Sequence, residues 1–296
     1  MMNRQRWRPA LAIVAAAAGT GFASGREIVC FFSQTGRAAW AGIGFACLVF
    51  ALLTGLTARE AVRQDAMSFP ELCYRMLGRR AARAACALYG LLLAVACVVM
   101  LRRAGETAAI ALPMEHAFLW GLTAALLLAL LFNRNGLRAL PLLGLPVVVL
   151  GLLFYAALAL DAGPVRVYVR GDASLALEDS VPTALLLALA YGALSACLAA
   201  GAAARFGRLS DGPAALGARC GALLGALLLC ANAAIVRGGR ALLIQALPTV
   251  ILSARWGLTG FWICAGFGYL CAVATLTAAL GGLIDLMRAV PPPQRC

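Results

Sequence analysis

Long apolar stretches follow one another along almost the whole chain, and short connections that carry most of the charged residues separate them. Each stretch is near or above about 18 residues, the length that a helix needs to cross roughly 30 Å of hydrocarbon. The pattern therefore predicts an all-α fold, a polytopic membrane helix bundle, in which residues 1–296 form a single transmembrane domain.

About eight membrane spans are predicted. In chain order they cover Pro9–Gln34, Ala38–Ala58, Ala81–Leu101, Ala117–Phe132, Ala139–Leu160, Pro182–Ala204, Ala214–Val236 and Thr259–Met287. The segment Ala241–Ser253, between the last two spans, is apolar but too short to cross, so we expect an interfacial or re-entrant helix there. The final residues, Pro291–Cys296, are predicted to form a tail.

The composition agrees with this pattern. Apolar residues make up 63% of the chain, against about 45–50% in soluble domains even when glycine is included, and the mean hydropathy is +0.90. A soluble domain of this size has too little interior to hide that much apolar surface. We therefore expect no soluble domain large enough to carry separate chemistry.

The charge is strongly positive, at +13, and all 25 basic residues are arginines. A basic chain can indicate nucleic-acid binding, but here the arginines lie in short connections between spans, which indicates membrane orientation. With the N-terminus inside, sixteen arginines fall on the inner side and eight on the outer side. We predict a multi-pass protein of the cell membrane with both termini cytoplasmic, the lipid bilayer as its partner and no nucleic-acid partner.

The first span is interrupted by a glycine-rich segment, which a charged pair, Arg26 and Glu27, follows directly. The segment consists of Gly19, Thr20, Gly21, Phe22, Ala23, Ser24 and Gly25. Each glycine weakens a helix by about 1 kcal/mol relative to alanine, and charge within a span usually faces a protein interior or a cavity. An unwound segment frees N–H groups for a substrate carboxylate and carbonyls for a cation. The alternative is that the glycines only let helices pack closely and the charged pair lies near the outer interface.

The run from Gly19 to Ile28, followed by Phe31 and Phe32, resembles the first-span signature of the YkvI-type membrane protein family. That signature reads roughly G-A-G-F-A-S/T-G-Q-E-I and then F-F, so Arg26 stands where the family usually has glutamine. The family is similar to the amino acid–polyamine–organocation transporters, whose LeuT-like fold contains two inverted five-helix repeats. The resemblance implies that residues 1–160 form the first repeat and residues 182–287 an incomplete second repeat, with spans 1 and 6 broken. The last two of ten core spans are missing by this comparison.

The resemblance also implies a function: secondary active transport of a small solute, with an amino acid as the implied class, coupled to Na⁺ or H⁺ and without a cofactor. The solute would lie between the breaks in spans 1 and 6, held by backbone groups of residues 19–25 and by Tyr191 and Gly192. Tyr191 would close over it. The alternative for Tyr191 is a packed ring whose hydroxyl bonds a neighbouring carbonyl.

Three polar side chains of span 8 are candidates for ion coupling. In sodium-coupled relatives the corresponding helix supplies two adjacent hydroxyls; here the candidates for a sodium contact are Thr275 and Thr277, and Ala278 follows. Residues two apart on a helix point about 200° apart, so only one threonine can face the site, and a threonine in a membrane helix often bonds its own backbone instead. Asp285, like Arg26 and Glu27, is a candidate for coupling or gating; the alternative is an interfacial charge.

A second function stays open, namely a non-transporting membrane partner or sensor derived from a transporter fold, and an oligomer is compatible with either function. The missing spans favour the second function. We do not expect an enzyme, because the sequence has no Ser/His/Asp set or HExxH-like motif and only one histidine, His116. We expect no resident metal either, because none of the eleven cysteines forms a CxxC pair.

Overall fold

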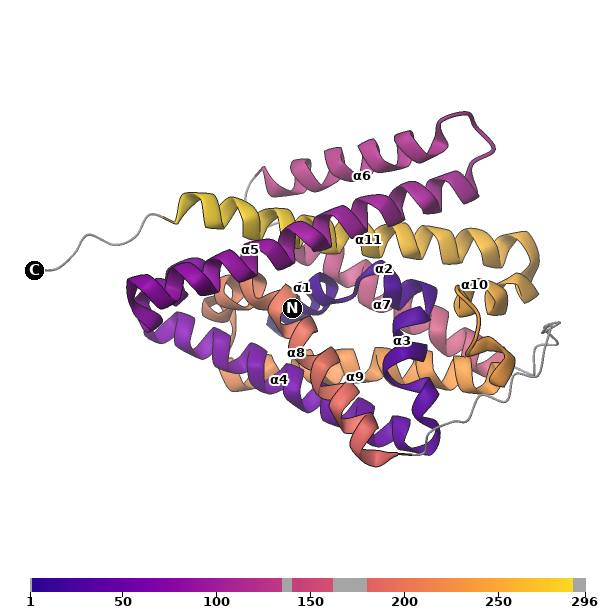
Figure 1. The fold of residues 1–296 in the computed structure, drawn as a ribbon, viewed down its shortest axis with the longest axis horizontal. Helices are drawn as coiled ribbons and strands as arrows, with labels where there is room; N and C mark the ends of the chain where they lie inside the picture. The colour runs from indigo at the N-terminus through magenta and orange to yellow at the C-terminus, as the bar shows by residue number, and fades with distance from the viewer. Residues whose placement is uncertain (1, 135–139, 162–179, 290–296) are drawn as a thin grey trace, which may run out of the picture.

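A computed structural model describes residues 2–134, 140–161 and 180–289, and every regular element in these ranges is helical (Figure 1). The longer helices are α1 (Met2–Ala17), α4 (Ala39–Arg63), α5 (Phe69–Ala111), α6 (Ala117–Asn133), α7 (Leu140–Asp161), α8 (Val181–Phe206), α9 (Pro213–Gly238) and α11 (Gly257–Arg288). The short elements are α2 (Thr20–Ser24), α3 (Arg26–Phe31), α10 (Pro248–Ser253) and the 3-10 turns η1 (Ser33–Ala38), η3 (Gly207–Leu209), η4 (Arg240–Leu242) and η5 (Ala254–Trp256). The predicted tail Pro291–Cys296 lies outside the described residues.

Six helical stretches of the described chain are long and apolar enough to cross a membrane. They are Ser33–Arg63, Phe69–Ala111, Leu140–Asp161, Val181–Leu209, Pro213–Gly238 and Pro248–Arg288. These overlap predicted spans 2, 3, 5, 6, 7 and 8. Large apolar side chains also point outward; Leu88, for example, is 70% exposed, as expected for a surface that meets lipid. The prediction of a polytopic membrane helix bundle is confirmed, and the count of eight spans stays a prediction.

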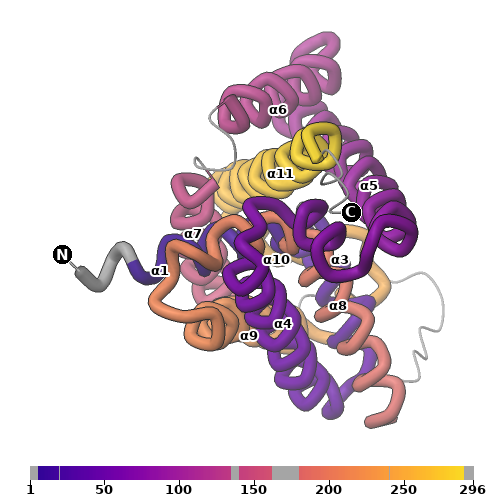
Figure 2. Tube along the Cα trace, turned by 90° about the vertical axis from the view of Figure 1, so that its left-hand side faces the viewer, coloured from indigo at the N-terminus to yellow at the C-terminus, as the bar shows by residue number. Residues whose placement is uncertain are grey.

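The first helix lies between two groups of longer helices. On one side α4 packs against α8 and α9, and on the other α5 packs against α6 and α11 (Figure 1). Figure 2 shows the same order from another direction, with α6 and α11 on one side and α4 and α9 on the other. Between them, α1 contacts α7, α8, α9 and α11, and residues 10–18 are almost wholly buried. Small residues make this close packing possible; a Cβ atom on Gly144 of α7 would lie 2.6 Å from the Leu11 carbonyl oxygen.

The sixth span is not broken, so that part of the predicted LeuT-like fold is wrong. Helix α8 runs without interruption from Val181 to Phe206. The physical reason lies in the sequence around Gly192, which is a single glycine among alanines and leucines. One glycine weakens a helix by about 1 kcal/mol, and strong helix formers on both sides offset that loss.

The third span is longer than predicted. Helix α5 begins at Phe69, within the connection between predicted spans 2 and 3, and Gly78, at φ 72°, kinks it. The Ser68 side chain accepts a hydrogen bond from the Glu71 backbone N–H at 3.4 Å, and the Glu71 carboxylate accepts one from the Met67 N–H at 2.8 Å. These two bonds form a capping arrangement that starts a helix, so much of the connection between predicted spans 2 and 3 is helical.

Candidate functional site

Between Pro9 and Phe31 of the predicted first span, the chain leaves the helical conformation twice. Helix α1 ends at Ala17, Gly19 is extended (φ −70°, ψ 178°), and Gly25 adopts the left-handed conformation at φ 76° between α2 and α3. Glycine takes that conformation without steric cost, which other residues do not. The predicted interruption over Gly19–Gly25 is therefore confirmed, with Thr20 to Ser24 forming one short helical turn between two breaks.

Side chains from distant helices hold the interrupted segment by its carbonyl groups. The Tyr155 hydroxyl of α7 donates a hydrogen bond to the Phe22 carbonyl, and the Thr249 hydroxyl of α10 donates one to the Ala23 carbonyl at 2.7 Å. Ser24 donates to the Gly21 carbonyl at 3.0 Å. The predicted re-entrant segment, in which α10 lies, thus packs on the break. Tyr155 and Thr249 were missed at the sequence level, because nothing near them in the chain points to residues 22 and 23.

The two charged side chains at the start of α3, Arg26 and Glu27, point in different directions. The Arg26 guanidinium donates to the Gln245 carbonyl at 3.2 Å, whereas the Glu27 carboxylate turns back toward α2. A Cβ atom on Gly21 would overlap this carboxylate, and a Cβ atom on Gly19 would lie 3.9 Å from Glu27 Oε1. The two glycines therefore make room for Glu27.

Glu27 is partly buried and makes no hydrogen bond or ion pair with the residues that the structure describes. Arg103 of α5 acts on it electrostatically. The Arg103 guanidinium, however, forms its ion pair with Glu106, at 3.0 Å. A carboxylate without a partner inside a helix bundle is costly, so Glu27 is a position where a cation or a proton is expected.

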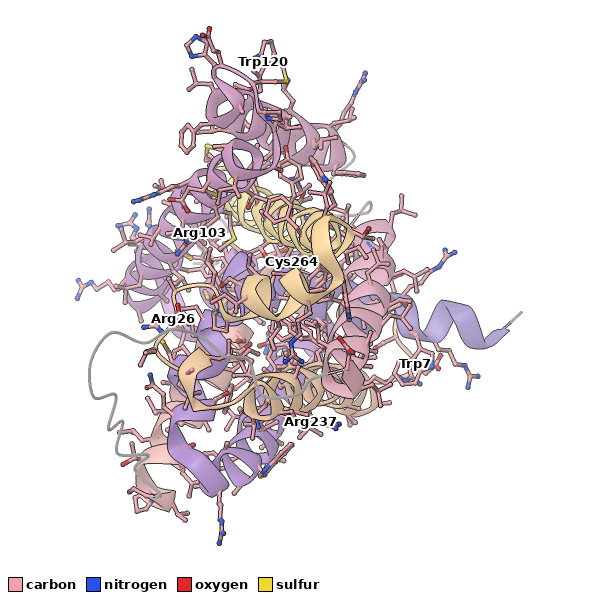
Figure 3. All side chains as sticks on the ribbon, turned by 90° about the vertical axis from the view of Figure 1, so that its right-hand side faces the viewer. Trp7, Arg26, Arg103, Trp120, Arg237 and Cys264 are labelled. Atoms are coloured by element: carbon pink, nitrogen blue, oxygen red, sulfur yellow. The ribbon has the colours of Figure 1, made fainter. Side chains whose placement is uncertain are left out.

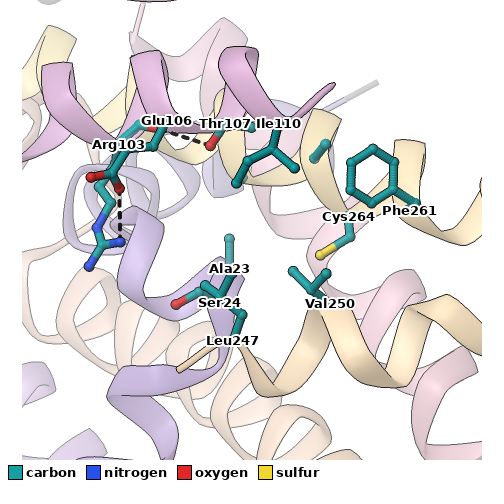
Figure 4. Close-up of a pocket in the computed structure, with 12 residues that line it drawn as sticks. Ala23, Ser24, Arg103, Glu106, Thr107, Ile110, Leu247, Val250, Phe261 and Cys264 are labelled. Atoms are coloured by element: carbon teal, nitrogen blue, oxygen red, sulfur yellow. Dashed lines mark hydrogen bonds and ion pairs between the residues drawn. The ribbon is translucent and has the colours of Figure 1, made fainter. Parts of the chain in front are cut away.

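A cavity of about 120 Å³ lies beside the break. Its lining comes from α2, α5, the segment that leads into α10, α10 itself and α11 (Figure 4). Three polar residues, Arg103, Glu106 and Thr107, lie together on α5, and the other walls are mainly apolar apart from the Ser24 hydroxyl of α2 (Figure 4). Figure 3, which looks along the longest axis of the molecule, shows Arg103 and Cys264 above Arg26. The full lining consists of Ala23, Ser24, Arg103, Glu106, Thr107, Ile110, Leu247, Val250, Phe261, Cys264, Ala265 and Gly268.

The two candidates on α8 face different neighbours. The Tyr191 ring packs on Phe31 and Phe32, with ring centroids 5.3 and 5.1 Å apart, so it lies beside α3. Gly192 faces α4 instead, where a Cβ atom would lie 2.7 Å from the Ala46 carbonyl oxygen. The structure thus brings Tyr191 to the interrupted span and places Gly192 in a helix–helix contact.

The hydroxyls of the two threonines of α11 contact different partners, as their spacing predicts. The Thr275 hydroxyl lies 3.4 Å from the Ala15 carbonyl of α1. Thr277 donates to the Val273 carbonyl of its own helix at 2.7 Å. Of the two hydroxyls, only that of Thr275 thus bonds the first span.

Asp285 lies ten residues further along α11 and does not join the break. Both of its oxygens lie 2.7 Å from Nη2 of Arg205 on α8. This ion pair joins α8 to α11 beside a second cavity, of about 410 Å³, which Glu71, Arg75 and Arg288 also line. The site at the break and the Arg205–Asp285 pair are therefore separate features.

These features define a membrane-embedded helix bundle in which the predicted first span, Pro9–Gln34, is interrupted and is hydrogen-bonded by side chains of other helices. No protein-family model matches the chain, and a search of curated proteins gives no match. The resemblance of Gly19–Phe32 to the YkvI-type family therefore stays a prediction that rests on that motif.

Proposed function

We propose that the protein is a secondary active transporter of a small solute, with an amino acid as the first class to test, and that Na⁺ or H⁺ drives it. The observation that carries this proposal is the double break of the first span beside a cavity. Irregular backbone within a membrane is tolerated where it lines a cavity or is buried in protein, and transporters use such segments to bind solutes and ions.

The solute would occupy the cavity beside Ala23 and Ser24. Arg103 and Glu106 lie on the same wall and pair with each other at 3.0 Å; on binding they would exchange this contact for the carboxylate and the ammonium of a zwitterion. The apolar wall, with Val250 and Phe261, would face an apolar side chain. In this proposal Thr249 and α10 cover the break from the outer side, and Tyr191 moves with α3 when the cavity opens.

The alternative is a non-transporting membrane partner or sensor. The continuous course of α8 favours it, because a transporter of the implied type would have a second broken helix opposite the first. In this alternative the break is a fixed structural feature, the cavity stays empty, and the Tyr155 and Thr249 hydrogen bonds only stabilise the fold.

Transport by purified protein in liposomes separates the two functions. The vesicles receive a radiolabelled mixture of amino acids while an inward Na⁺ or H⁺ gradient is imposed, with protein-free vesicles as the control. A transporter accumulates label under one of the gradients and loses it when the gradient is collapsed. Equal label in both kinds of vesicle under every gradient would contradict transport of this class and favour the partner or sensor.

A further inference from the structure

We propose that Glu27 is the site that binds the coupling ion and that this ion is a proton rather than sodium. The inference rests on the proposed transport function and names its coupling ion. Four observations carry it: the position of the Glu27 carboxylate, its lack of a partner, the groups around it, and the engagement of the hydroxyls that a sodium ion would need.

The position of Glu27 links the carboxylate to both halves of the break. Its backbone belongs to α3, after the left-handed turn at Gly25, whereas its carboxylate lies against Gly21 of α2. Adding or removing a charge there acts on both sides of the Gly25 turn at once. A proton on Glu27 therefore changes the energetics of the segment that borders the cavity.

The ionisable groups that act on Glu27 electrostatically come from four helices. Arg103 of α5 is a cation, and Tyr155 of α7, Tyr191 of α8 and Cys271 of α11 each interact with it electrostatically. The tyrosines and the cysteine are neutral near pH 7, and Arg103 is already paired with Glu106. Helix α9 packs on this region through two uncharged side chains. Asn232 bonds Ser33, and Ile235 lies beside Gly25.

Few of the groups around Glu27 stabilise its carboxylate in the charged form. A carboxylate that is partly withdrawn from water is destabilised unless it is paired or hydrogen-bonded, and it then takes up a proton more readily. Intramembrane acidic residues with such surroundings form proton relays in pumps and transporters. No covalent step other than protonation is needed: the carboxylate forms an O–H bond with a proton from one aqueous side and returns that proton to the other.

Few free oxygen ligands are available for a sodium ion at this position. Sodium in proteins is held by several oxygen atoms, as other hard cations are. The Thr277 hydroxyl is engaged with its own helix, the Thr275 hydroxyl is 3.4 Å from the Ala15 carbonyl, and the next position is Ala278. The Phe22 and Ala23 carbonyls already accept bonds from Tyr155 and Thr249. A proton needs only the carboxylate.

Infrared spectroscopy tests proton binding without any solute. Difference spectra between acidic and alkaline buffer are recorded for the reconstituted wild type, for Glu27→Gln and for Glu60→Gln, a carboxylate of α4 paired with Arg63 at 3.7 Å. We expect a titrating carboxyl C=O band that Glu27→Gln removes and Glu60→Gln retains. A spectrum that Glu27→Gln leaves unchanged would overturn the assignment of the proton site.

Proton flux tests the coupling. Vesicles that contain a pH-sensitive dye receive the unlabelled amino-acid mixture outside, in sodium-free buffer, and uptake of the labelled mixture is measured in parallel. We expect internal acidification with the wild type, and at least a tenfold loss of both signals in Glu27→Gln with exchange of preloaded label retained. Uptake that needs sodium and moves no protons would overturn the proton assignment and leave transport standing. No uptake under any gradient would overturn the proposed function for amino acids, and the coupling with it.

Discussion

The Thr249 hydroxyl donates a hydrogen bond to the Ala23 carbonyl at 2.7 Å, although 226 residues separate the two in the chain. Ala23 lies between the two breaks at Gly19 and Gly25, and Thr249 is the second residue of α10. The bond joins α10, which is too short to cross the membrane, to the helical turn α2 between the breaks at Gly19 and Gly25. It therefore gives a direct way to probe how the break is held.

We expect Thr249→Val to lower the stability of the protein by about 1 kcal/mol, because it removes one hydrogen bond and keeps the shape of the side chain. Thermal unfolding in detergent measures the effect. Thr123→Val is the matched control, since Thr123 is exposed on α6 and bonds only carbonyls of its own helix. Equal shifts in the two variants would show that the Thr249 bond adds nothing.

The contact between Gly21 and Glu27 predicts a coupled pair of substitutions. Gly21→Ala places a Cβ atom on the Glu27 carboxylate, and such overpacking costs about 1–3 kcal/mol. In Gly21→Ala/Glu27→Ala the overlap disappears, so the double variant should be more stable than the sum of the single changes predicts. The unfolding free energies of the four proteins measure this coupling.

The matched control for that experiment is Gly44→Ala on α4, because a Cβ atom on Gly44 has no heavy atom within 4 Å. We expect it to be neutral or to stabilise by up to about 1 kcal/mol, as an alanine does in a helix. Purely additive effects of Gly21→Ala and Glu27→Ala would contradict the contact.

Replacing one residue of the Arg205–Asp285 pair should destabilise the protein more than replacing both. Asp285→Ala leaves the Arg205 guanidinium without its carboxylate in a position where Asp285 is almost buried, and we expect a loss of about 2–3 kcal/mol. Replacing both residues by methionine should cost less than the single change, because no charge is left unpaired. For comparison, Glu60→Ala breaks an ion pair whose arginine is 70% exposed and should cost about 0.5 kcal/mol. A smaller loss in Asp285→Ala than in Glu60→Ala would contradict this account.

The neighbouring positions Tyr191 and Gly192 should behave differently. Gly192→Ala presses on the Ala46 carbonyl of α4, so we expect a lower melting temperature and an unchanged affinity for any solute. Tyr191→Ala removes the ring that packs on Phe31 and Phe32 and should change both quantities. Isothermal titration of a solute found in the uptake assay compares the affinities; a weaker affinity in Gly192→Ala than in Tyr191→Ala would reverse the assignment of the two faces.

The sequence predicts the interruption of the first span well because its signal is local. Three glycines lie within seven residues, and a charged pair follows at once, so the helix is weakened where charge must also be accommodated. The predicted break in α8 rests on the family resemblance of Tyr191 and Gly192, whereas locally Gly192 is a single glycine among strong helix formers. The continuous course of α8 shows that the local helix propensity prevails there over the pattern that the resemblance implies.

The partners of the break are not predictable from the sequence, because they depend on packing between distant segments. Tyr155 and Thr249 are ordinary polar residues within apolar stretches, and only the fold brings them to the Phe22 and Ala23 carbonyls. The direction of Glu27 is a similar case. Its proximity to Arg26 in the chain implies a local pair, whereas the left-handed turn at Gly25 sends the carboxylate toward Gly21 and Arg26 toward Gln245.

The most direct test of the central claim, that the interrupted first span forms a solute site, is thermal unfolding of the purified protein with a panel of amino acids, with and without Na⁺. A ligand that binds only the folded protein raises the melting temperature. We predict a rise with a defined subset of amino acids in the wild type and in Gly44→Ala, and its loss in Gly21→Ala. A well-folded wild type whose melting temperature responds to none of them, or a rise that Gly21→Ala leaves intact, would contradict a site for this class of solute at the break.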